Sequence, residues 1–333
     1  MTFKICVIGC GGIAIHRHGP AYKKYAREHL GTELTACCDL VEQKAIDFST
    51  RFGFQRYYTD MVRMLEVERP NAVCMLVPPA DTCELACQVL TRHFPLLLEK
   101  PPGLTTAETD RIIAAADASG TPNMVAFNRR MMPLVSVLKS QLTENPTLSH
   151  LQHLQYALYR VGRTDPDFST TAIHGIDAAR VIAGSDYTRI TFHYYQTLHM
   201  NAGVVNIFMD CTFLSGATAQ LSFLPLSGAA VERAVLHFKD QAYFLSLPAG
   251  KGLDGSGSLL RVVNGSITDK ITGSQAAGSD EGFVLEGFYA ENAEFFDAIR
   301  NGRLPPNNIE SGRQSVEIAQ CIRERKTEYH MET

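Results

Sequence analysis

The chain has 333 residues, of which 45% are hydrophobic and 20% charged, a balance typical of globular rather than disordered proteins. This length favours about two domains. A net charge of −4 offers no basic surface to a nucleic acid, and no apolar run approaches the roughly 18 residues that a membrane helix needs. We therefore expect neither a nucleic acid nor a membrane as a partner.

Nine cysteines are an odd number, and they lie mostly inside apolar runs, among them Cys6, Cys37, Cys38 and Cys74. This usage is typical of buried thiols in a reduced, cytoplasmic protein rather than of a disulfide framework. Cys83 and Cys87 lie one helical turn apart, but without a second Cys or His pair nearby they form a weak zinc pattern, so no metal is expected. The apolar run before Gly9 is too short for a signal peptide and leads directly into a glycine cluster, so we expect it to be mature sequence.

Residues 1–128 alternate between short apolar strands and helical segments. The strand candidates are Phe3–Ile8, Glu33–Cys38, Ala72–Val77, Pro95–Leu98 and Met124–Phe127. The helical candidates are Ile13–Leu30, Ala80–Arg92 and Thr105–Ser119. The last has Thr105 or Thr106 as a cap, Glu108 in its first turn and Gly120 at its end. This alternation predicts an α/β domain with a parallel sheet and right-handed crossovers.

The pattern changes after Pro133, where a helix over Leu134–Leu142 precedes a series of strand-like segments. They are Leu151–Val161, Val205–Leu214, Ala217–Leu224, Ala234–Phe238, Ala242–Leu247 and Leu259–Val263. Short connections suited to hairpins predict a large, mostly antiparallel open sheet in an α+β domain over residues 129–333. The Gly/Ser-rich stretches Gly250–Ser258 and Gly273–Asp280 are expected to be surface loops. Two helices, Tyr289–Arg300 and Ser311–Arg325, are expected at the end.

The segment Gly9-Cys10-Gly11-Gly12-Ile13-Ala14 has the pattern G-x-G-x-x-A, directly after a buried strand and at the start of a helical stretch. This is the context that a dinucleotide-binding turn requires. Gly9 would permit the tight turn, Gly11 would let a pyrophosphate approach the backbone, and Ala14 would allow close packing of helix on strand. The unpaired N–H groups of Gly12 and Ile13 at the helix start would then face the phosphates. A purely structural glycine turn is the alternative.

Asp39 follows the second strand, where an acidic residue accepts hydrogen bonds from the adenosine ribose and repels a 2′-phosphate. It lies 28 residues after Gly11 (39 − 11), more than the usual spacing of about 20, so the intervening helix must be long. No arginine follows Asp39 immediately. NAD is therefore the expected cofactor, and NADP is less favoured.

Glu99-Lys100-Pro101-Pro102 follows the fourth strand candidate, and the carboxyl ends of strands in an open α/β sheet face the ligand. A partly desolvated lysine beside a cofactor there can exchange protons near neutral pH. A solvated surface charge is the commoner alternative for a lone lysine.

With these motifs the chain resembles, over most of its length, the glucose–fructose oxidoreductase / inositol dehydrogenase (Gfo/Idh/MocA) family. The Glu-Lys-Pro tripeptide at residues 99–101 is its most specific element. The resemblance implies that Lys100 contacts the reacting hydroxyl, that the peptide after it is cis, and that Pro78 and Glu99 belong to the cofactor site. It also implies hydride transfer between NAD and a CH–OH carbon of a sugar, a polyol or a related acid.

A later segment, Thr170–Arg180, predicts a helix that is capped by Thr170 or Thr171 and ends at Gly184. His174 and Asp177 are three residues apart and share a face, so Asp177 could orient the imidazole. Spacing alone favours a surface salt bridge. The resemblance instead places the active-site histidine of the family at His174, which makes Lys100 and His174 the acid/base candidates.

The chain departs from the family pattern near this histidine. Thr170 stands where inositol-type dehydrogenases have an aspartate, and Ala172 stands where a glycine is expected. The Pro-Asn-x-x-His of the family appears as residues 78–82, Pro-Pro-Ala-Asp-Thr. Because a threonine can hydrogen-bond a substrate but does not ionise near neutral pH, Thr170 and Asp177 are expected to contact the substrate rather than complete a proton relay.

Four arginines flank the predicted substrate region: Arg129, Arg130, Arg160 and Arg163. Guanidinium groups can bind a carboxylate or phosphate, which makes Arg129 and Arg160 candidate contacts for a small-molecule substrate, with surface salt bridges as the alternative. Two other functions stay open: a lyase or glycosidase that reduces and reoxidises its own NAD, and a non-catalytic regulator that binds dinucleotide. An exposed face of the large sheet favours a homodimer or homotetramer.

Overall fold

The computed structural model describes residues 2–144, 150–165, 167–196, 203–250 and 252–331. The chain divides into two compact units, Met1–Asn128 with Gly287–Val316, and Arg129–Glu286 with Glu317–Thr333. The first unit therefore takes in a C-terminal segment that the sequence pattern placed in the second domain. In the parts of the chain that the structure describes, no helix is long and apolar enough to cross a membrane.

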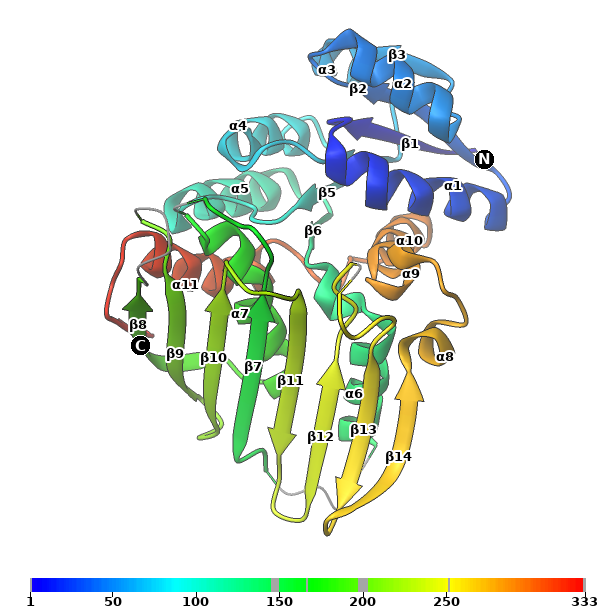
Figure 1. Ribbon diagram of the computed structural model, residues 1–333. Helices are drawn as coiled ribbons and strands as arrows, with labels where there is room; N and C mark the ends of the chain where they lie inside the picture. The colour runs from blue at the N-terminus through cyan, green and yellow to red at the C-terminus, as the bar shows by residue number, and fades with distance from the viewer. Residues whose placement is uncertain (1, 145–149, 166, 197–202, 251, 332–333) are drawn as a thin grey trace. The chain divides into compact units, whose positions relative to one another are not determined.

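A parallel sheet of six strands, in the order β3-β2-β1-β4-β5-β6, forms the centre of the first unit (Figure 1). The strands are β1 (Phe3–Ile8), β2 (Thr32–Cys38), β3 (Arg56–Tyr58), β4 (Ala72–Met75), β5 (Leu96–Glu99) and β6 (Asn123–Ala126). This is the strand order of a doubly wound dinucleotide-binding fold, with its switch point between β1 and β4. The prediction of a parallel α/β domain is confirmed. The short β3 had no apolar pattern to predict it, because two of its three residues are exposed.

The helices of this unit connect successive strands. They are η1 (Ala14–His18), α1 (Gly19–Glu28), α2 (Glu42–Phe52), α3 (Met61–Glu68), α4 (Pro79–Leu90) and α5 (Thr106–Ser119), followed by η2 (Asn128–Met131) at the end of this stretch. Thr105 and Glu108 form the capping box of α5, and Gly120 ends it with a φ of 61°. The single helix expected over Ile13–Leu30 is instead a π-helical turn, η1, followed by α1.

Aromatic packing accounts for the place of the C-terminal segment in the first unit. The ring of Phe296, on α10 (Phe288–Arg300), lies 5.0 Å from that of Tyr25 and 6.2 Å from that of Phe3. The Tyr25 hydroxyl donates to Asp297 at 2.6 Å. Burial of three aromatic side chains therefore ties α10 to β1 and α1, although about 270 residues separate them in the sequence.

The second unit is built on a sheet of nine strands in the order β14-β13-β12-β11-β7-β10-β9-β8-β15 (Figure 1). They are β7 (His153–Tyr159), β8 (Tyr187–Tyr195), β9 (Asn206–Phe213), β10 (Thr218–Leu224), β11 (Val231–His237), β12 (Gln241–Ser246), β13 (Ser258–Val263), β14 (Ser266–Thr272) and β15 (Glu328–His330). The β7–β10 pair is parallel and the other paired neighbours are antiparallel. The prediction of a large, mostly antiparallel sheet is confirmed.

Side chains alternate between a buried and an open face of this sheet, as the pattern of β7 shows. On the buried face, α7 (Ser169–Ala183) lies against β7 and β10, and α6 (Pro133–Thr143) lies against β13. An added Cβ on Gly175 would come within 2.6 Å of the Phe223 ring, so this glycine permits the close approach of α7. On the open face, Tyr195 and Phe208 keep 57% and 37% of their surface exposed.

The remaining helices are α8 (Gly273–Ala277), α9 (Gly282–Leu285), η3 (Glu310–Gly312) and α11 (Arg313–Arg323). Two further local predictions are wrong. The expected loop Gly273–Asp280 begins with α8, because Thr272 and Gln275 form a capping box. Helix α7 begins at Ser169 rather than after Thr170 or Thr171, because Asp167 accepts a hydrogen bond from the Ser169 N–H at 2.9 Å. Part of the other expected loop, Gly250–Ser258, lies outside the described residues at position 251.

Candidate active site

The carboxyl edge of the parallel sheet brings together most of the residues predicted for the cofactor. The glycine turn follows β1, Asp39 follows β2, Pro78 lies beyond β4 and Glu99 ends β5, with Lys100 next to it. These four strands are neighbours in the sheet. Because ligands of doubly wound folds bind outside this edge at the switch point, the sequence motifs converge where a dinucleotide would lie.

The glycine turn has the backbone that its motif predicts. Gly9 adopts a φ of +94°, and a Cβ there would overlap the Leu76 carbonyl oxygen. An added Cβ on Gly11 or Gly12 would meet no atom within 4 Å, so the backbone at both positions is open to a ligand. The first N–H groups of a helix have no partner within the helix, and those after Gly11 therefore suit a pyrophosphate. This bare turn fits the phosphates of NAD.

Asp39 is held beside the glycine turn by two backbone groups. Its Oδ2 accepts from the Cys10 N–H and its Oδ1 from the Val41 N–H, both at 2.9 Å. A carboxylate has about four acceptor positions, so both oxygens keep capacity for ribose hydroxyls. The fixed negative charge at this point favours NAD over a cofactor with a 2′-phosphate.

Glu99 links Lys100 to the buried interior of the first unit. One oxygen, Oε2, accepts from the Lys100 backbone N–H at 3.0 Å, and Oε1 lies 2.9 Å from Nε2 of His18. Burial disfavours the charge of Glu99, but the hydrogen bond from His18 and the nearby Lys100 outweigh it and keep the pKa of this carboxyl below its usual value. The Lys100-Pro101 peptide is cis, as the resemblance implied.

His174 and Thr170 lie on α7 in the second unit. They are four residues apart and therefore on the same side of the helix, and both are partly exposed. The Nη1 of Arg129 lies 3.5 Å from Nε2 of His174. A guanidinium has only donors, so this nitrogen of the imidazole presents a lone pair to Arg129.

Two of the predicted substrate arginines converge on one carboxylate that sequence reasoning missed. Arg129 makes two hydrogen bonds to Glu232, each of 3.0 Å, and Arg160 makes one of 2.7 Å. The Tyr156 hydroxyl donates to the same carboxylate at 2.8 Å. Burial would raise the pKa of Glu232, but the two guanidinium groups outweigh it and lower the pKa to about 2. We refer to Arg129, Arg160, Glu232 and Tyr156 as the Glu232 cluster.

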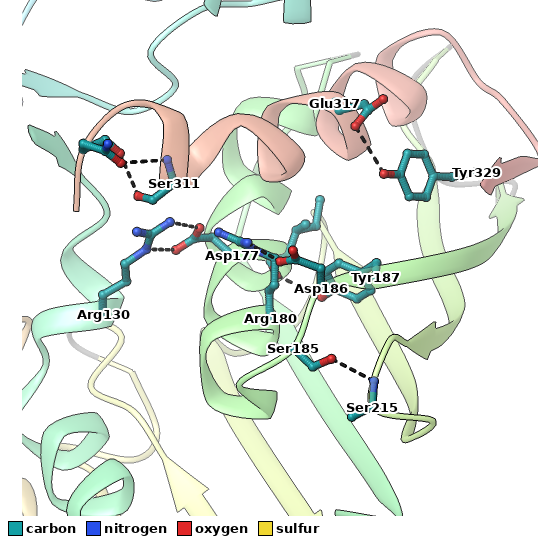
Figure 2. Close-up of polar contacts among 12 residues, drawn as sticks. Arg130, Asp177, Arg180, Ser185, Asp186, Tyr187, Ser215, Ser311, Glu317 and Tyr329 are labelled. Carbon is teal, nitrogen blue, oxygen red and sulfur yellow. Dashed lines mark hydrogen bonds and ion pairs between the residues drawn. The ribbon is translucent and has the colours of Figure 1, made fainter. Parts of the chain in front are cut away.

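Asp177 is paired with Arg130 in the interior of the second unit. The guanidinium makes hydrogen bonds of 2.8 and 2.6 Å to the two carboxylate oxygens, which Figure 2 shows as two parallel bonds. Both side chains are almost fully buried. The expectation that Asp177 orients the His174 ring stays a prediction. Arg163 pairs with Asp165 at the surface, the alternative that the sequence left open.

Comparison with known proteins supports the assignment of the first unit. Residues 3–127 match the model of an oxidoreductase family with an NAD-binding Rossmann fold. Oxidoreductase P35 of Formosa agariphila is 30% identical over 139 residues, 42% of this chain and of that protein. Inositol 2-dehydrogenase of Burkholderia ambifaria is 26% identical over 209 residues, 61% of each chain. D-Apiose dehydrogenase of Paraburkholderia graminis is 28% identical over 142 residues, 43% of this chain and 36% of its own. The matched stretches thus span between 36% and 61% of the length of these relatives.

Solved structures share the fold of the whole chain. Levoglucosan dehydrogenase in complex with NADH and levoglucosan is 17% identical, covers 100% of both chains and has a TM-score of 0.84. An oxidoreductase from Agrobacterium radiobacter in complex with NAD+, L-tartaric acid and magnesium is 15% identical, covers 99% of this chain and 98% of its own, and has a TM-score of 0.80. These likenesses confirm the predicted fold class, and the family match confirms NAD as the predicted cofactor. Residues 3–127, in the first unit, therefore match the NAD-binding Rossmann domain of the Gfo/Idh/MocA oxidoreductase family.

Proposed function

We propose that the protein is an NAD-dependent dehydrogenase that transfers a hydride between nicotinamide and a CH–OH or carbonyl carbon of a sugar, a polyol or a related acid. The observation that carries the proposal is the convergence of the glycine turn, Asp39 and Glu99-Lys100 at the carboxyl edge of neighbouring strands. The substrate class rests on the relatives, which include inositol and D-apiose dehydrogenases.

Residues of the first unit would hold NAD, which supplies the hydride acceptor when it is bound. Gly9, Gly11, Gly12 and Ile13 would receive the pyrophosphate on their backbone, and Asp39 would accept from the adenosine ribose. Pro78 and Glu99, at the ends of β4 and β5, would line the same edge. With Asp39 and Glu99 assigned to the cofactor, Lys100 is the neighbouring ionisable side chain that we assign to the substrate.

Lys100 and His174 would handle the substrate hydroxyl. In the oxidation direction, the neutral amine of Lys100 accepts the hydroxyl proton as the hydride leaves the carbon. His174 would hydrogen-bond the same oxygen and position it, with the guanidinium of Arg129 beside its ring. In the reduction direction the proton returns from the Lys100 ammonium to the carbonyl oxygen.

Substrate contacts are proposed for Thr170, Arg129 and Arg160. Thr170 shares a side of α7 with His174, and Arg129 lies against His174 while the buried Glu232 holds it in place. Asp177 is fully buried against Arg130, so we assign it to holding that arginine instead of the substrate contact predicted for it. The active site would then have a rigid hydrogen-bonded frame behind its substrate contacts.

The open face of the nine-stranded sheet supports a homo-oligomer. It carries a hollow of about 730 Å³ whose lining includes Tyr159, Tyr195, Phe208 and Val235. Exposed aromatic side chains gathered on one sheet face are typical of subunit interfaces. We therefore propose a homodimer or homotetramer through this face. The nine cysteines are all free, which supports a reducing, cytoplasmic location.

The proposal is tested by the absorbance of reduced nicotinamide during incubation of the purified protein with NAD and a panel of polyols, sugars and sugar acids. We expect the absorbance to rise with one chemical class of substrate. In His174→Ala, the rate of this rise should be lower by 10²-fold or more, which is on the order of the contribution of one acid/base group. Bound NAD without net reduction across the panel would contradict the proposal and favour internal redox cycling or a regulator.

A further inference from the structure

His18 is a fully buried histidine for which neither the motifs nor the proposed mechanism has a use. It is the last residue of η1, the π-helical turn that follows the glycine turn. Its Nε2 lies 2.9 Å from Oε1 of Glu99, and its Nδ1 lies 3.0 Å from Nδ2 of Asn292. Its ring therefore joins the helix after the glycine turn to the end of β5 and to α10, all within the first unit.

The partners of Asn292 fix the hydrogen on the His18 ring. Nδ2 of Asn292 also donates to the Phe288 carbonyl oxygen at 2.7 Å, which sets the orientation of the amide. An amide nitrogen only donates, so Nδ1 of His18 accepts from it. The ring is then neutral, with its hydrogen on Nε2 and directed at Glu99. The result is a one-way series of hydrogen bonds, from Asn292 to His18 and from His18 to Glu99.

Glu99 completes this series at Lys100. Its side chain is only 12% exposed, and each oxygen has one fixed partner, His18 for Oε1 and the Lys100 N–H for Oε2. A carboxylate held at both oxygens cannot rotate without breaking one of the bonds. The backbone from which the Lys100 side chain projects is thus attached to the helix that would receive the pyrophosphate.

We propose that His18 and Asn292 are positioning residues for Lys100, acting through Glu99. The inference rests on the proposed role of Lys100 as the proton acceptor. Without the hydrogen bond from His18, Oε1 of Glu99 loses its partner and the carboxylate is free to turn away from the Lys100 N–H. A displacement of about 1 Å of a catalytic group costs about 10²-fold in rate, so the loss should be in turnover rather than in binding.

The experiment compares three substitutions with the wild type. His18→Leu removes the donor to Glu99, and His18→Gln keeps a donor because a glutamine side-chain amide can reach the place of Nε2. Asn292→Leu, on α10, removes the group that donates to Nδ1 of His18. This variant replaces His18→Leu in the comparison if His18→Leu does not fold. Thr121→Val is the matched control, because it removes a buried hydrogen bond to the Leu90 carbonyl in the same unit.

Two readouts are needed. One is kcat with its KM and the Kd for NAD; the other is the NMR resonance of Lys100 after reductive ¹³C-methylation of lysines, assigned with Lys100→Arg. In His18→Leu we expect kcat to fall about 10²-fold with KM and Kd unchanged, and the Lys100 resonance to move. In His18→Gln, kcat and the Lys100 resonance should lie close to their wild-type values. In Asn292→Leu, kcat and the resonance should change in the same direction as in His18→Leu. Thr121→Val should change neither kcat nor the resonance.

Unchanged kcat and an unmoved Lys100 resonance in a folded His18→Leu protein would overturn the inference. A fall in kcat that Thr121→Val reproduces would overturn it as well, because the effect would then come from lost stability. If Lys100→Met keeps its activity, the proposed role of Lys100 fails, and the resonance alone decides whether His18 positions that lysine.

Discussion

Replacing Glu232 with glutamine tests how the arginines beside His174 are held. The carboxylate of Glu232 is fully buried, and it accepts from Arg129, Arg160 and Tyr156. Glutamine keeps the shape but removes the charge and replaces one acceptor oxygen with a donor that would face a guanidinium. The variant therefore leaves two largely buried cations without their counter-ion.

The magnitude follows from the pKa of Glu232, which the arginines lower from 4.5 to about 2. Each pH unit of difference between the folded and unfolded pKa is worth about 1.4 kcal/mol, so the charge contributes about 3 kcal/mol to the free energy of unfolding at neutral pH. This agrees with the loss of about 3–5 kcal/mol that is usual when one partner of a buried ion pair is removed.

The sign of the pH dependence is fixed by the direction of the shift. A carboxyl whose pKa is lowered by folding stabilises the protein fully above its unfolded pKa of 4.5, and this contribution is lost as the pH falls toward 2. The difference in the free energy of unfolding between wild type and Glu232→Gln should be constant from pH 7 to pH 5. It should then shrink by about 1.4 kcal/mol at pH 3.5, because the wild type alone loses this contribution.

Urea unfolding followed by circular dichroism at pH 7, 5 and 3.5 measures these differences. Glu84→Gln is the control, because its ion pair with Arg111 is 3.5 Å long and more than 60% exposed on both sides, and should lose less than about 0.5 kcal/mol. A loss below about 1 kcal/mol in Glu232→Gln, or a loss that does not change between pH 5 and 3.5, would refute the reasoning about the Glu232 cluster.

Three further substitutions test other parts of the structure. Gly9→Ala should lose more than about 2 kcal/mol of stability in urea unfolding, because a Cβ at its φ of +94° would overlap the Leu76 carbonyl; wild-type stability would contradict the turn geometry. Asp39→Asn should raise the Kd for NAD about tenfold in a fluorescence titration and reduce the preference over NADP, since a charged hydrogen-bond acceptor is lost; an unchanged preference would remove Asp39 from the ribose site. Arg130→Met should lose about 3–5 kcal/mol, and adding Asp177→Leu should recover most of it, because the single variant removes the cation that pairs with a buried carboxylate; additive losses in the thermal melts would contradict this.

The sequence predicted those parts of the fold in which local pattern and environment agree. The strand Phe3–Ile8 has the predicted bounds, because every residue except Lys4 is apolar and buried, on both faces of the strand. The edge strand β14 was missed because its residues are mostly exposed and polar, so it has no apolar face. The π-helical turn η1 was also missed, since residues 14–18 are compatible with an ordinary α-helix.

For the candidate site, the motifs with fixed local spacing were predictable and the long-range partners were not. Gly9, Asp39 and Lys100 each follow a strand that the sequence reveals. Glu232 left a signal that could have been used, because it is in phase with Ala234 and Leu236 on the buried side of β11, where a carboxylate needs a buried cation. The pairing of His18 with Asn292, by contrast, joins positions 274 residues apart and leaves no local pattern.

The measurement that tests the central claim most directly is the turnover of Lys100→Met, compared with wild type on the substrate class that reduces NAD, together with the Kd for NAD of both proteins. If Lys100 is the proton acceptor, the variant should lose on the order of 10²–10⁴-fold in kcat and bind NAD with unchanged affinity. A Lys100→Met protein that keeps full turnover would contradict the assignment of Lys100, and with it the proposed mechanism.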